Sequence, residues 1–320
     1  MQQTFDRFAQ LIDPSHILVS TNETYADIVR NQLPELPPEN ILAEPIYRST
    51  APSVAWASHR ILRQCPEACL VVTPSDQAIQ GEEAFQRDII RGLDFVSKKD
   101  GMLTLGVKPT RPEPGYGYIQ MGKEVENDVF EVQSFTEKPD REFARMFMQS
   151  GEFYWNTGLF LLNVQFARNR FCELLPPVLR KFDANNPKFN PHEEALFIRE
   201  NFPLYPNLSI EHGILESSND VFVMQCHFGW ADLGTWHGMY ETMQKGENDN
   251  VVIDSDVILE DSSNNIIKLP KGKLGVINGL EGFIVVEKDN VLLICKKEDS
   301  SAKVRKYVNE VMLKKGEGFV

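Results

Sequence analysis

The sequence predicts an α/β fold with a doubly wound, mostly parallel sheet, followed by a small β domain. Up to about residue 107, short apolar runs alternate with stretches of helical periodicity. Strands that are apolar throughout and alternate with helices are typical of parallel sheets covered on both faces. Beyond about residue 248, short β-type segments are separated by Asn, Gly and Asp. We therefore place an α/β domain at residues 1–245 and a small β domain, which could form a short β-helix, at residues 246–320.

Each predicted element has its own signal in the chain. Apolar runs predict strands, and helices are predicted to begin at capping residues such as Thr21 or Asn22 and Asp140. The Gly- and Pro-rich stretch at residues 111–139 is typical of a flap over a binding site. The strands are predicted at residues 16–20, 41–43, 68–73, 102–107, 158–162, 221–225, 251–253, 257–259, 283–286 and 291–294. The helices are predicted from residues 21–22 to 33, from 49, from 81, from 140 to 149, over 166–200, from 235, and over 301–312.

Charge and composition limit the partners of the chain. The 320 residues include 33 Lys and Arg against 46 Asp and Glu, for a net charge of −13, and no basic block interrupts this excess. Such a balance argues against nucleic acid or an anionic membrane surface as partner. No window has the roughly 18 to 20 apolar residues of a membrane span, and the first residues lack a signal-peptide core. Five irregularly spaced cysteines without a Cys-x-x-Cys pair predict reduced thiols in a cytoplasmic protein.

An acid and a base lie side by side where a predicted strand ends. Glu137 and Lys138 follow the alternating segment at residues 132–136, and Pro139 stops the strand. In open α/β sheets, ligands bind at the carboxyl ends of the strands. Glu137 can accept hydrogen bonds from hydroxyl groups, and Lys138 can bind a phosphate as a point charge. Taken alone, the pair is also compatible with solvated surface charge.

Two aspartates also follow buried strands. Asp76 comes just after the strand at residues 68–73, and Asp232 comes after the strand at residues 221–225. Carboxylates at this edge of a sheet can hold Mg²⁺, the metal that phosphoryl transfer commonly requires. The alternative is a turn in which each Asp bonds its own backbone, which is a common role for Asp after a strand.

Five segments, taken in order, resemble the sugar-1-phosphate nucleotidyltransferases, and among them most the mannose-1-phosphate guanylyltransferases. These segments are residues 74–76 (Pro-Ser-Asp), 115–119 (Gly-Tyr-Gly-Tyr-Ile), 135–139 (Phe-Thr-Glu-Lys-Pro), 155–158 (Trp-Asn-Thr-Gly) and 228–236 (Phe-Gly-Trp-Ala-Asp-Leu-Gly-Thr-Trp). The resemblance implies a Rossmann-like nucleotidyltransferase domain. It implies transfer of GMP from GTP to mannose 1-phosphate, which gives GDP-mannose and pyrophosphate. The resemblance is compatible with a homodimer.

The resemblance also implies roles for individual residues. Asp76 and Asp232 would bind Mg²⁺, and together with Lys138, which would steady the sugar phosphate, they would form the catalytic set. The residues implied to surround the hexose are Gly117, Glu137, Asn156 and Gly158. Residues 44–52 resemble the nucleobase segment of the family, and the residues implied there are Glu44, Arg48, Thr50 and Ala51.

The sequence departs from the family pattern at several positions. Four are small changes: Ser49 replaces the commoner Asn, Gln77 the commoner His, and Ala231 and Thr235 the commoner Ser. The larger departure is that the Gly-rich phosphate loop of the family, Gly-Gly-x-Gly-x-Arg-x-x-Pro, is not found in the sequence as written. We therefore expect the chain as written to turn over poorly. The alternatives are another sugar-1-phosphate nucleotidyltransferase, such as one that uses dTTP, and a relative that binds a sugar nucleotide without turnover.

Overall fold

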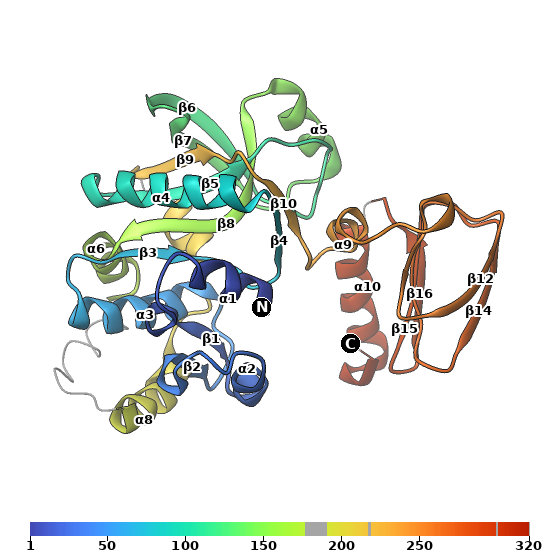
Figure 1. Cartoon of the computed structure of the whole chain (residues 1–320), viewed down its shortest axis with the longest axis horizontal. Coiled ribbons are helices and arrows are strands. Elements are labelled where there is room, and N and C mark those ends of the chain that lie inside the picture. The colour runs from blue at the N-terminus through green and yellow to red at the C-terminus, as the bar shows by residue number, and fades with distance from the viewer. Residues whose placement is uncertain (177–190, 217–218, 299, 320) are drawn as a thin grey trace.

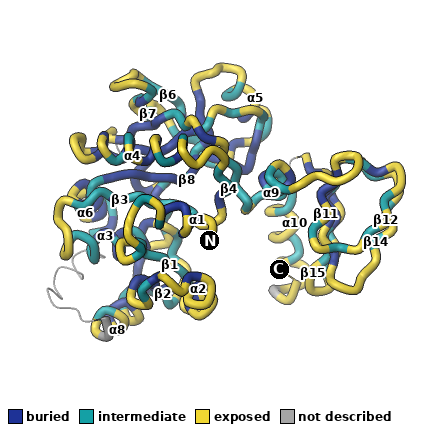
Figure 2. Tube along the Cα trace, viewed as in Figure 1, coloured by how far each residue is buried: buried dark blue, intermediate teal, exposed yellow. Residues whose placement is uncertain are grey.

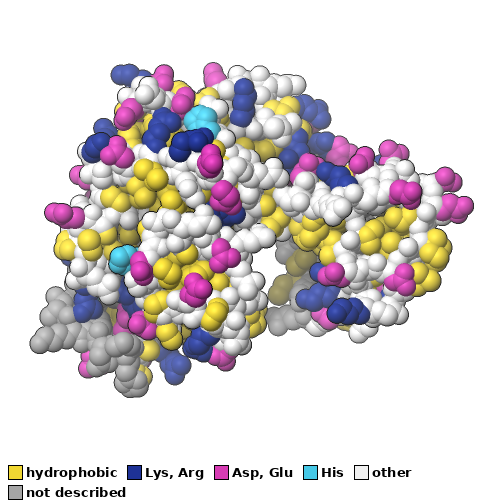
Figure 3. Space-filling view, viewed as in Figure 1, with side chains coloured by type: hydrophobic (Ala, Val, Ile, Leu, Met, Phe, Trp, Pro, Cys, Tyr) yellow, Lys and Arg dark blue, Asp and Glu magenta, His cyan; other side chains and the backbone are white. Residues whose placement is uncertain are grey.

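The computed structural model describes residues 1–176, 191–216, 219–298 and 300–319. The chain forms a larger α/β lobe and a smaller C-terminal lobe of β strands flanked by helices (Figure 1). Strands near the middle of the larger lobe are buried along much of their length, whereas the smaller lobe is more exposed (Figure 2). On the face shown in Figure 3, acidic and basic side chains are interspersed over both lobes.

The central sheet has six strands in the order β3-β8-β5-β9-β7-β6. Their bounds are β3 Cys69–Val72, β8 Phe153–Asn163, β5 Met102–Val107, β9 Val221–Gln225, β7 Val129–Thr136 and β6 Tyr118–Glu126. Of its neighbouring pairs, β5–β9 is parallel, and β3–β8, β5–β8, β7–β9, β6–β7 and β6–β8 are antiparallel. The prediction of a mostly parallel sheet was therefore wrong. An apolar run reports burial on both faces of a strand, and a central antiparallel strand such as β8 is buried in the same way.

Helices cover both faces of this sheet. On one face, α4 (Glu82–Lys98) packs through Phe85 and Ile89 against a buried cluster that includes Leu159 and Leu161 of β8. The alternate residues of β8, including Phe160 and Leu162, belong to the cluster under α3 (Thr50–Gln64) and α6 (Val164–Leu174) on the other face. Successive side chains of a strand point to opposite faces, so β8 contributes to both cores.

Two smaller sheets complete the larger lobe. Strands β1 (Val19–Asn22) and β2 (Ile41–Glu44) pair in parallel. Strands β4 (Gln77–Gln80) and β10 (Gly229–Asp232) form an antiparallel ribbon. The remaining helices of this lobe and of its junction with the C-terminal lobe are α1 Gln2–Ala9, α2 Ala26–Gln32, α5 Arg141–Ser150, α8 Pro191–Asn201 and α9 Trp236–Thr242. A π-helical turn covers Glu211–Leu215, and short 3-10 turns lie at Pro14–His16, Glu23–Tyr25, Pro38–Asn40, Phe202–Leu204, Glu247–Asp249 and Glu317–Phe319.

The C-terminal lobe has stacked parallel strands, as in a short β-helix. Its strands are β11 Val251–Ile253, β12 Asp256–Glu260, β13 Ile266–Lys268, β14 Leu274–Asn278, β15 Phe283–Lys288 and β16 Val291–Lys296. The strands β11, β13 and β15 pair in parallel, as do β12 and β14, while β16 is antiparallel to β15. Apolar side chains such as Ile267 and Val285 form a core with residues of β12 and β14. Helices α9 and α10 (Ser300–Lys315) contribute to the cluster around Ile266 and Ile284.

The element predictions from sequence agree with the structure at several places. The strands predicted at residues 102–107 and 221–225 coincide with β5 and β9. The helix predicted over residues 166–200 is represented by α6 and α8, and its middle part, residues 177–190, lies outside the described residues. Within the described part of the chain, no helix is long and apolar enough to cross a membrane.

Candidate functional site

The carboxylates of Asp76 and Asp232 converge beside one glycine. In the β4–β10 ribbon Asp232 lies opposite Gln77, and the amide of Leu233 donates a hydrogen bond of 2.9 Å to the Asp76 carbonyl. A Cβ atom added at Gly234 would lie 2.9 Å from Asp232 Oδ1 and 3.2 Å from Asp76 Oδ2. The space beside Gly234 is therefore bounded by oxygens of both aspartates.

The surroundings of Asp232 combine burial with opposing charges. Burial raises the pKa of the Asp232 carboxyl, the Gly234 amide at 2.7 Å lowers it, and the negative charge of Asp76 raises it again. Lys138 lowers this pKa and Glu113 raises it, so both side chains act on the same carboxylate. Asp232 is partly buried and Asp76 is exposed, and the repulsion between the two carboxylates favours a bound cation. Oxygen donors around a space of this kind suit Mg²⁺, so the residues present fit that metal.

Glu137 and Lys138 form a paired group beside Gly117. The ammonium group of Lys138 lies 2.5 Å from Glu137 Oε1. The backbone of Lys138 has a φ of 45°, in the left-handed region that non-glycine residues seldom adopt. A Cβ atom at Gly117 would lie 3.0 Å from Glu137 Oε2 and 2.9 Å from the Phe135 ring, so only glycine fits there without a shift. The absence of a side chain at Gly117 thus lets the backbone approach the Glu137 carboxylate closely.

Asn156 and Gly158 lie where β8 changes partners. β8 pairs with β6 up to Trp155 and with β3 from Phe160 onward. The amide of Asn156 donates to the Gly117 carbonyl at 2.8 Å, and Asn156 Oδ1 accepts from the Gly158 amide at 3.2 Å. Gly158 has a φ of 72°, and an added Cβ would lie 3.1 Å from Pro74 Cγ, two residues before Asp76. The predicted hexose residues therefore lie in one connected region with the paired carboxylates.

The segment predicted to bind the nucleobase is held by hydrogen bonds of its own. Glu44 is 7% exposed, and its Oε1 accepts from the hydroxyl groups of Ser20 at 2.5 Å and Ser53 at 2.6 Å. Burial raises the pKa of Glu44, although both hydroxyls lower it. The hydrogen bonds of Glu44 therefore connect β1, β2 and α3.

The other three residues of this segment bond to the loop at residues 203–210. Arg48 donates to the Pro203 carbonyl at 2.5 Å, and the Ala51 amide donates to the Leu208 carbonyl at 3.0 Å. Thr50 Oγ1 accepts from the Ile210 amide at 2.9 Å. Within the described residues, the hydrogen bonds of this segment do not reach Asp76 or Asp232. The residues predicted to bind the hexose therefore lie close to the two aspartates, whereas hydrogen bonds do not connect either group to this segment.

Sequence reasoning did not single out Arg111 and Glu113 in the flap, and it included Tyr116 only as part of the segment at residues 115–119. Glu113 is 6% exposed and accepts a hydrogen bond of 2.9 Å from the Gly115 amide. The Arg111 guanidinium lies 5.0 Å from the centre of the Trp155 ring and 5.8 Å from that of Tyr116. The sequence signal for these residues was that they lie in or next to the Gly-Tyr-Gly segment. The burial of Glu113 could not be predicted, because charged residues are usually exposed.

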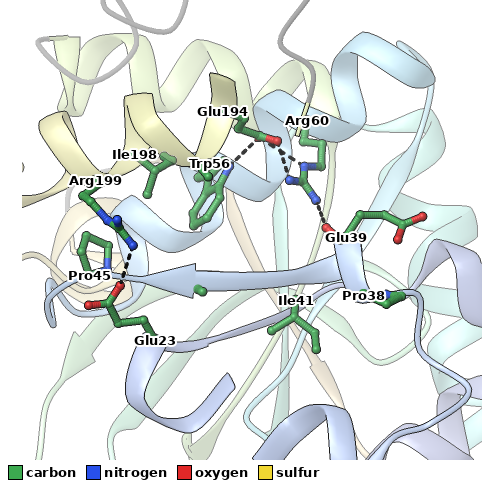
Figure 4. Close-up of a pocket in the computed structure, with 12 residues that line it drawn as sticks. Glu23, Pro38, Glu39, Ile41, Pro45, Trp56, Arg60, Glu194, Ile198 and Arg199 are labelled. Carbon is green, nitrogen blue, oxygen red and sulfur yellow. Dashed lines mark hydrogen bonds and ion pairs between the residues drawn. The ribbon is translucent and has the colours of Figure 1, made fainter. Parts of the chain in front are cut away.

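A separate cavity of about 250 Å³ is lined by residues of β2, α3 and α8 (Figure 4). Trp56 Nε1 donates to Glu194 at 2.7 Å, Arg60 pairs with the same carboxylate, and Arg199 lies 3.6 Å from Glu23. These charges neutralise one another across the cavity. None of the residues predicted for the site lines it.

Comparisons with known proteins agree with this arrangement. The family model described as "Nucleotidyl transferase" matches residues 1–249. The chain is 30% identical over 314 residues to a mannose-1-phosphate guanylyltransferase of Salmonella muenchen, covering 97% of this chain and 65% of that protein. It is 33% identical over 315 residues to the alginate biosynthesis protein AlgA of Pseudomonas aeruginosa, covering 93% and 62%. The chain thus spans about two thirds or less of the length of these relatives.

One solved structure shares the fold over nearly the whole chain. It is described as mannose-1-phosphate geranyltransferase from Thermus thermophilus, with a TM-score of 0.79, 24% identity, and coverage of 97% of this chain and 88% of that one. A further match to a mannose-1-phosphate guanylyltransferase of Salmonella montevideo is 33% identical over 325 residues and covers 67% of that protein. The chain therefore belongs to the nucleotidyl transferase family, and its relatives there include mannose-1-phosphate guanylyltransferases.

Proposed function

We propose that this protein transfers GMP from GTP to mannose 1-phosphate, giving GDP-mannose and pyrophosphate. The observation that carries the proposal is the convergence of Asp76 and Asp232 on Gly234, with the charge of Lys138 acting on Asp232. This set lies in the same region as Asn156 and Gly158. We assign the transfer to residues 1–245, and residues 246–320 to the small β domain.

The proposed chemistry needs positioning and charge neutralisation more than a strong acid or base. A phosphate oxygen of mannose 1-phosphate attacks the α-phosphorus of GTP, and pyrophosphate leaves. Lys138 binds the sugar phosphate, and Asp76 and Asp232 would hold Mg²⁺. When bound, the cation would neutralise the charge that develops on the phosphate oxygens.

Recognition of the hexose falls to groups on β8 and on the turn after β7. The Asn156 amide and the Glu137 carboxylate can exchange hydrogen bonds with sugar hydroxyls, and Gly117 and Gly158 leave the space that a Cβ would otherwise fill. We assign the nucleobase to the segment that contains Glu44, Arg48, Thr50 and Ala51. Hydrogen bonds to Ser20, Ser53 and the residues at 203–210 hold this segment in place, which favours discrimination between bases.

A comparison of substrates tests the proposal. Pyrophosphate release is measured with GTP, dTTP, ATP and UTP, each with mannose 1-phosphate or glucose 1-phosphate, in the presence of Mg²⁺. Binding of each ligand is followed in parallel by thermal shift. The proposal expects the highest turnover with GTP and mannose 1-phosphate. A clear preference for dTTP would assign the protein to a thymidylyl enzyme, and binding of GDP-mannose without turnover would favour a sugar-nucleotide-binding role.

A further inference from the structure

The amino end of α10, in the C-terminal lobe, lies directly against the flap of the larger lobe. The Ser301 hydroxyl is 3.4 Å from Glu113 Oε1, and Arg305 Nη2 is 3.5 Å from the Pro114 carbonyl oxygen. Both distances are long for hydrogen bonds, so packing contributes more to this contact than hydrogen bonding does. A Cβ atom at Gly115 would lie 2.8 Å from Glu113 Oε1 in the flap, 2.8 Å from Ser301 Oγ and 3.0 Å from Ser301 Cβ. The flap and α10 therefore meet without space for one more methyl group.

Glu113 connects this contact to the interior of the flap. Its carboxylate is 6% exposed, accepts the Gly115 amide at 2.9 Å and lies 3.4 Å from Arg111 Nη2. Its own amide donates to the Tyr118 hydroxyl at 3.0 Å. Because a buried carboxylate is costly without partners, these bonds hold the loop in one conformation.

The loop in turn contacts the residues of the proposed site. The Tyr116 ring packs edge-on against Trp155 and Trp230, with centroid distances of 5.2 Å and 5.0 Å. Burial raises the pKa of the Tyr116 hydroxyl, and a hydrogen bond with the side chain of Thr235, three residues after Asp232, lowers it in part. The next residue of the flap, Gly117, lies against Glu137.

A second contact between the lobes reaches the segment after Lys138. Arg141, the first residue of α5, forms an ion pair with Glu298, just before α10. The C-terminal lobe thus contacts two separate segments, the flap that contains Gly117 and the segment that directly follows Lys138.

We propose that the amino end of α10 clamps the flap and the start of α5, so that Ser301 and Glu113 are positioning residues for the sugar 1-phosphate. The identity of that ligand rests on the function proposed above. The contact between the two lobes does not depend on which ligand binds.

Hydrogen exchange of the full chain without ligand tests the clamp directly. The Gly115→Ala variant inserts a methyl group between the flap and α10. We expect amides of residues 111–118 to exchange roughly fivefold faster or more, as for the loss of one hydrogen bond. The Gly115→Ala/Ser301→Gly double variant removes the Ser301 atoms that the methyl group meets but keeps its contact with Glu113 Oε1, so protection should return in part toward that of Ser301→Gly alone. Unchanged exchange in Gly115→Ala, or no recovery in the double variant, would overturn the proposal.

The kinetic consequence is measured separately. In Gly115→Ala, KM for mannose 1-phosphate should rise roughly fivefold while KM for GTP changes less than about twofold. In the double variant, KM for mannose 1-phosphate should return part of the way to that of Ser301→Gly. Lys306→Ala is the control, because Lys306 is on α10 and pairs with Glu310 of the same helix. If exchange responds but wild-type protein does not use mannose 1-phosphate, the clamp stands and the proposed function fails. If KM for both substrates rises equally in Gly115→Ala, the positioning role for the sugar site is wrong.

Discussion

Gln77 and Asp232 lie opposite each other in the β4–β10 ribbon, and Gln77 Nε2 donates to the Thr157 carbonyl of β8. Gln77 is 6% exposed, so this hydrogen bond is made in the interior. The Gln77 side chain therefore connects the β4–β10 ribbon, which ends at Asp232 and follows Asp76, to β8, which contains Asn156 and Gly158. The spacing between the proposed metal and hexose groups depends on this connection.

Replacing Gln77 should affect both stability and activity. Gln77→Leu keeps the approximate size of the side chain but leaves the Thr157 carbonyl without this donor, which should cost about 1–3 kcal/mol of unfolding free energy. Urea denaturation measures this loss, and pyrophosphate release should fall as well. Gln80→Leu is the control, because Gln80 is on the same strand but exposed. Equal stability of the two variants would contradict the proposed connection.

Removing either carboxylate charge should nearly abolish Mg²⁺-dependent turnover. We expect Asp76→Asn and Asp232→Asn each to lose roughly 10²-fold or more in kcat, the loss typical of one key electrostatic group. The stabilisation of the protein by GTP in the presence of Mg²⁺ should decrease in parallel. The control is Asp94→Asn, since Asp94 is exposed on α4 and pairs with Lys98. Near-normal turnover in both site variants would refute the assignment.

The charge of Lys138 should be specific for the sugar phosphate. Lys138→Gln should raise KM for mannose 1-phosphate by about 10-fold or more, because a hydrogen bond between charged groups is worth about 1.5–3 kcal/mol. KM for GTP should change much less. Lys98→Gln removes a similar exposed charge from a residue that has no proposed role and pairs with Asp94. It should leave KM for both substrates unchanged. Equal effects of Lys138→Gln on the two substrates would assign Lys138 a different role.

Two glycines with the same backbone conformation separate strain from contact. Gly158 and Gly151 have φ values of 72° and 73°, but an added Cβ meets Pro74 at 3.1 Å only at Gly158, and nothing within 4 Å at Gly151. Both alanine variants should lose about 1–2 kcal/mol through the left-handed backbone. Gly158→Ala should lose more than Gly151→Ala and should also lose activity. Chemical denaturation of both variants checks the difference, and similar losses would show that Pro74 moves aside freely.

His237 should make the protein less stable in mild acid. Burial, followed by the charges of Arg111, Lys297 and Lys245, lowers the pKa of His237 to about 4, despite Glu241 Oε1 at 3.5 Å. The unfolded chain takes up a proton near pH 6.5, before the folded protein does. Stability contributed by the neutral ring is therefore present above about pH 6.5 and is lost as the pH falls toward about 4.

Thermal unfolding between about pH 7 and pH 4.5 checks this prediction. His237→Gln should show a smaller loss of Tm over this range than the unmodified chain. His212→Gln is the control, because the His212 side chain is 52% exposed. The same pH dependence in His237→Gln and the unmodified chain would contradict the assignment.

Local patterns predicted many elements because they report burial and capping. Asp140 was predicted to begin a helix, and its carboxylate accepts from the Phe143 amide at 3.0 Å, as a helix cap does. The strands at residues 102–107 and 221–225 were predicted from their apolar runs. The direction of β8 was not predictable in this way, since the same run of buried residues suits either direction.

The candidate residues were found from short motifs at strand ends, and the structure brings many of them together. Asp76, Lys138 and Asp232 are far apart in sequence. In the structure, the charges of Asp76 and Lys138 both change the pKa of the Asp232 carboxyl. What the sequence did not reveal were the contacts of Glu113 and Gln77. Their burial depends on tertiary packing between segments that no local pattern relates, because polar residues such as these are ordinarily exposed.

The position of β9 in the sheet has a consequence for how the chain folds. Residues 221–225 insert between β5 and β7, whose residues come much earlier in the chain. During synthesis, the sheet therefore lacks an interior strand until nearly the whole larger lobe has left the ribosome. Pairing between segments so distant in sequence slows folding and leaves strand edges open in the meantime. We expect nascent chains that end before residue 221 to depend on chaperones.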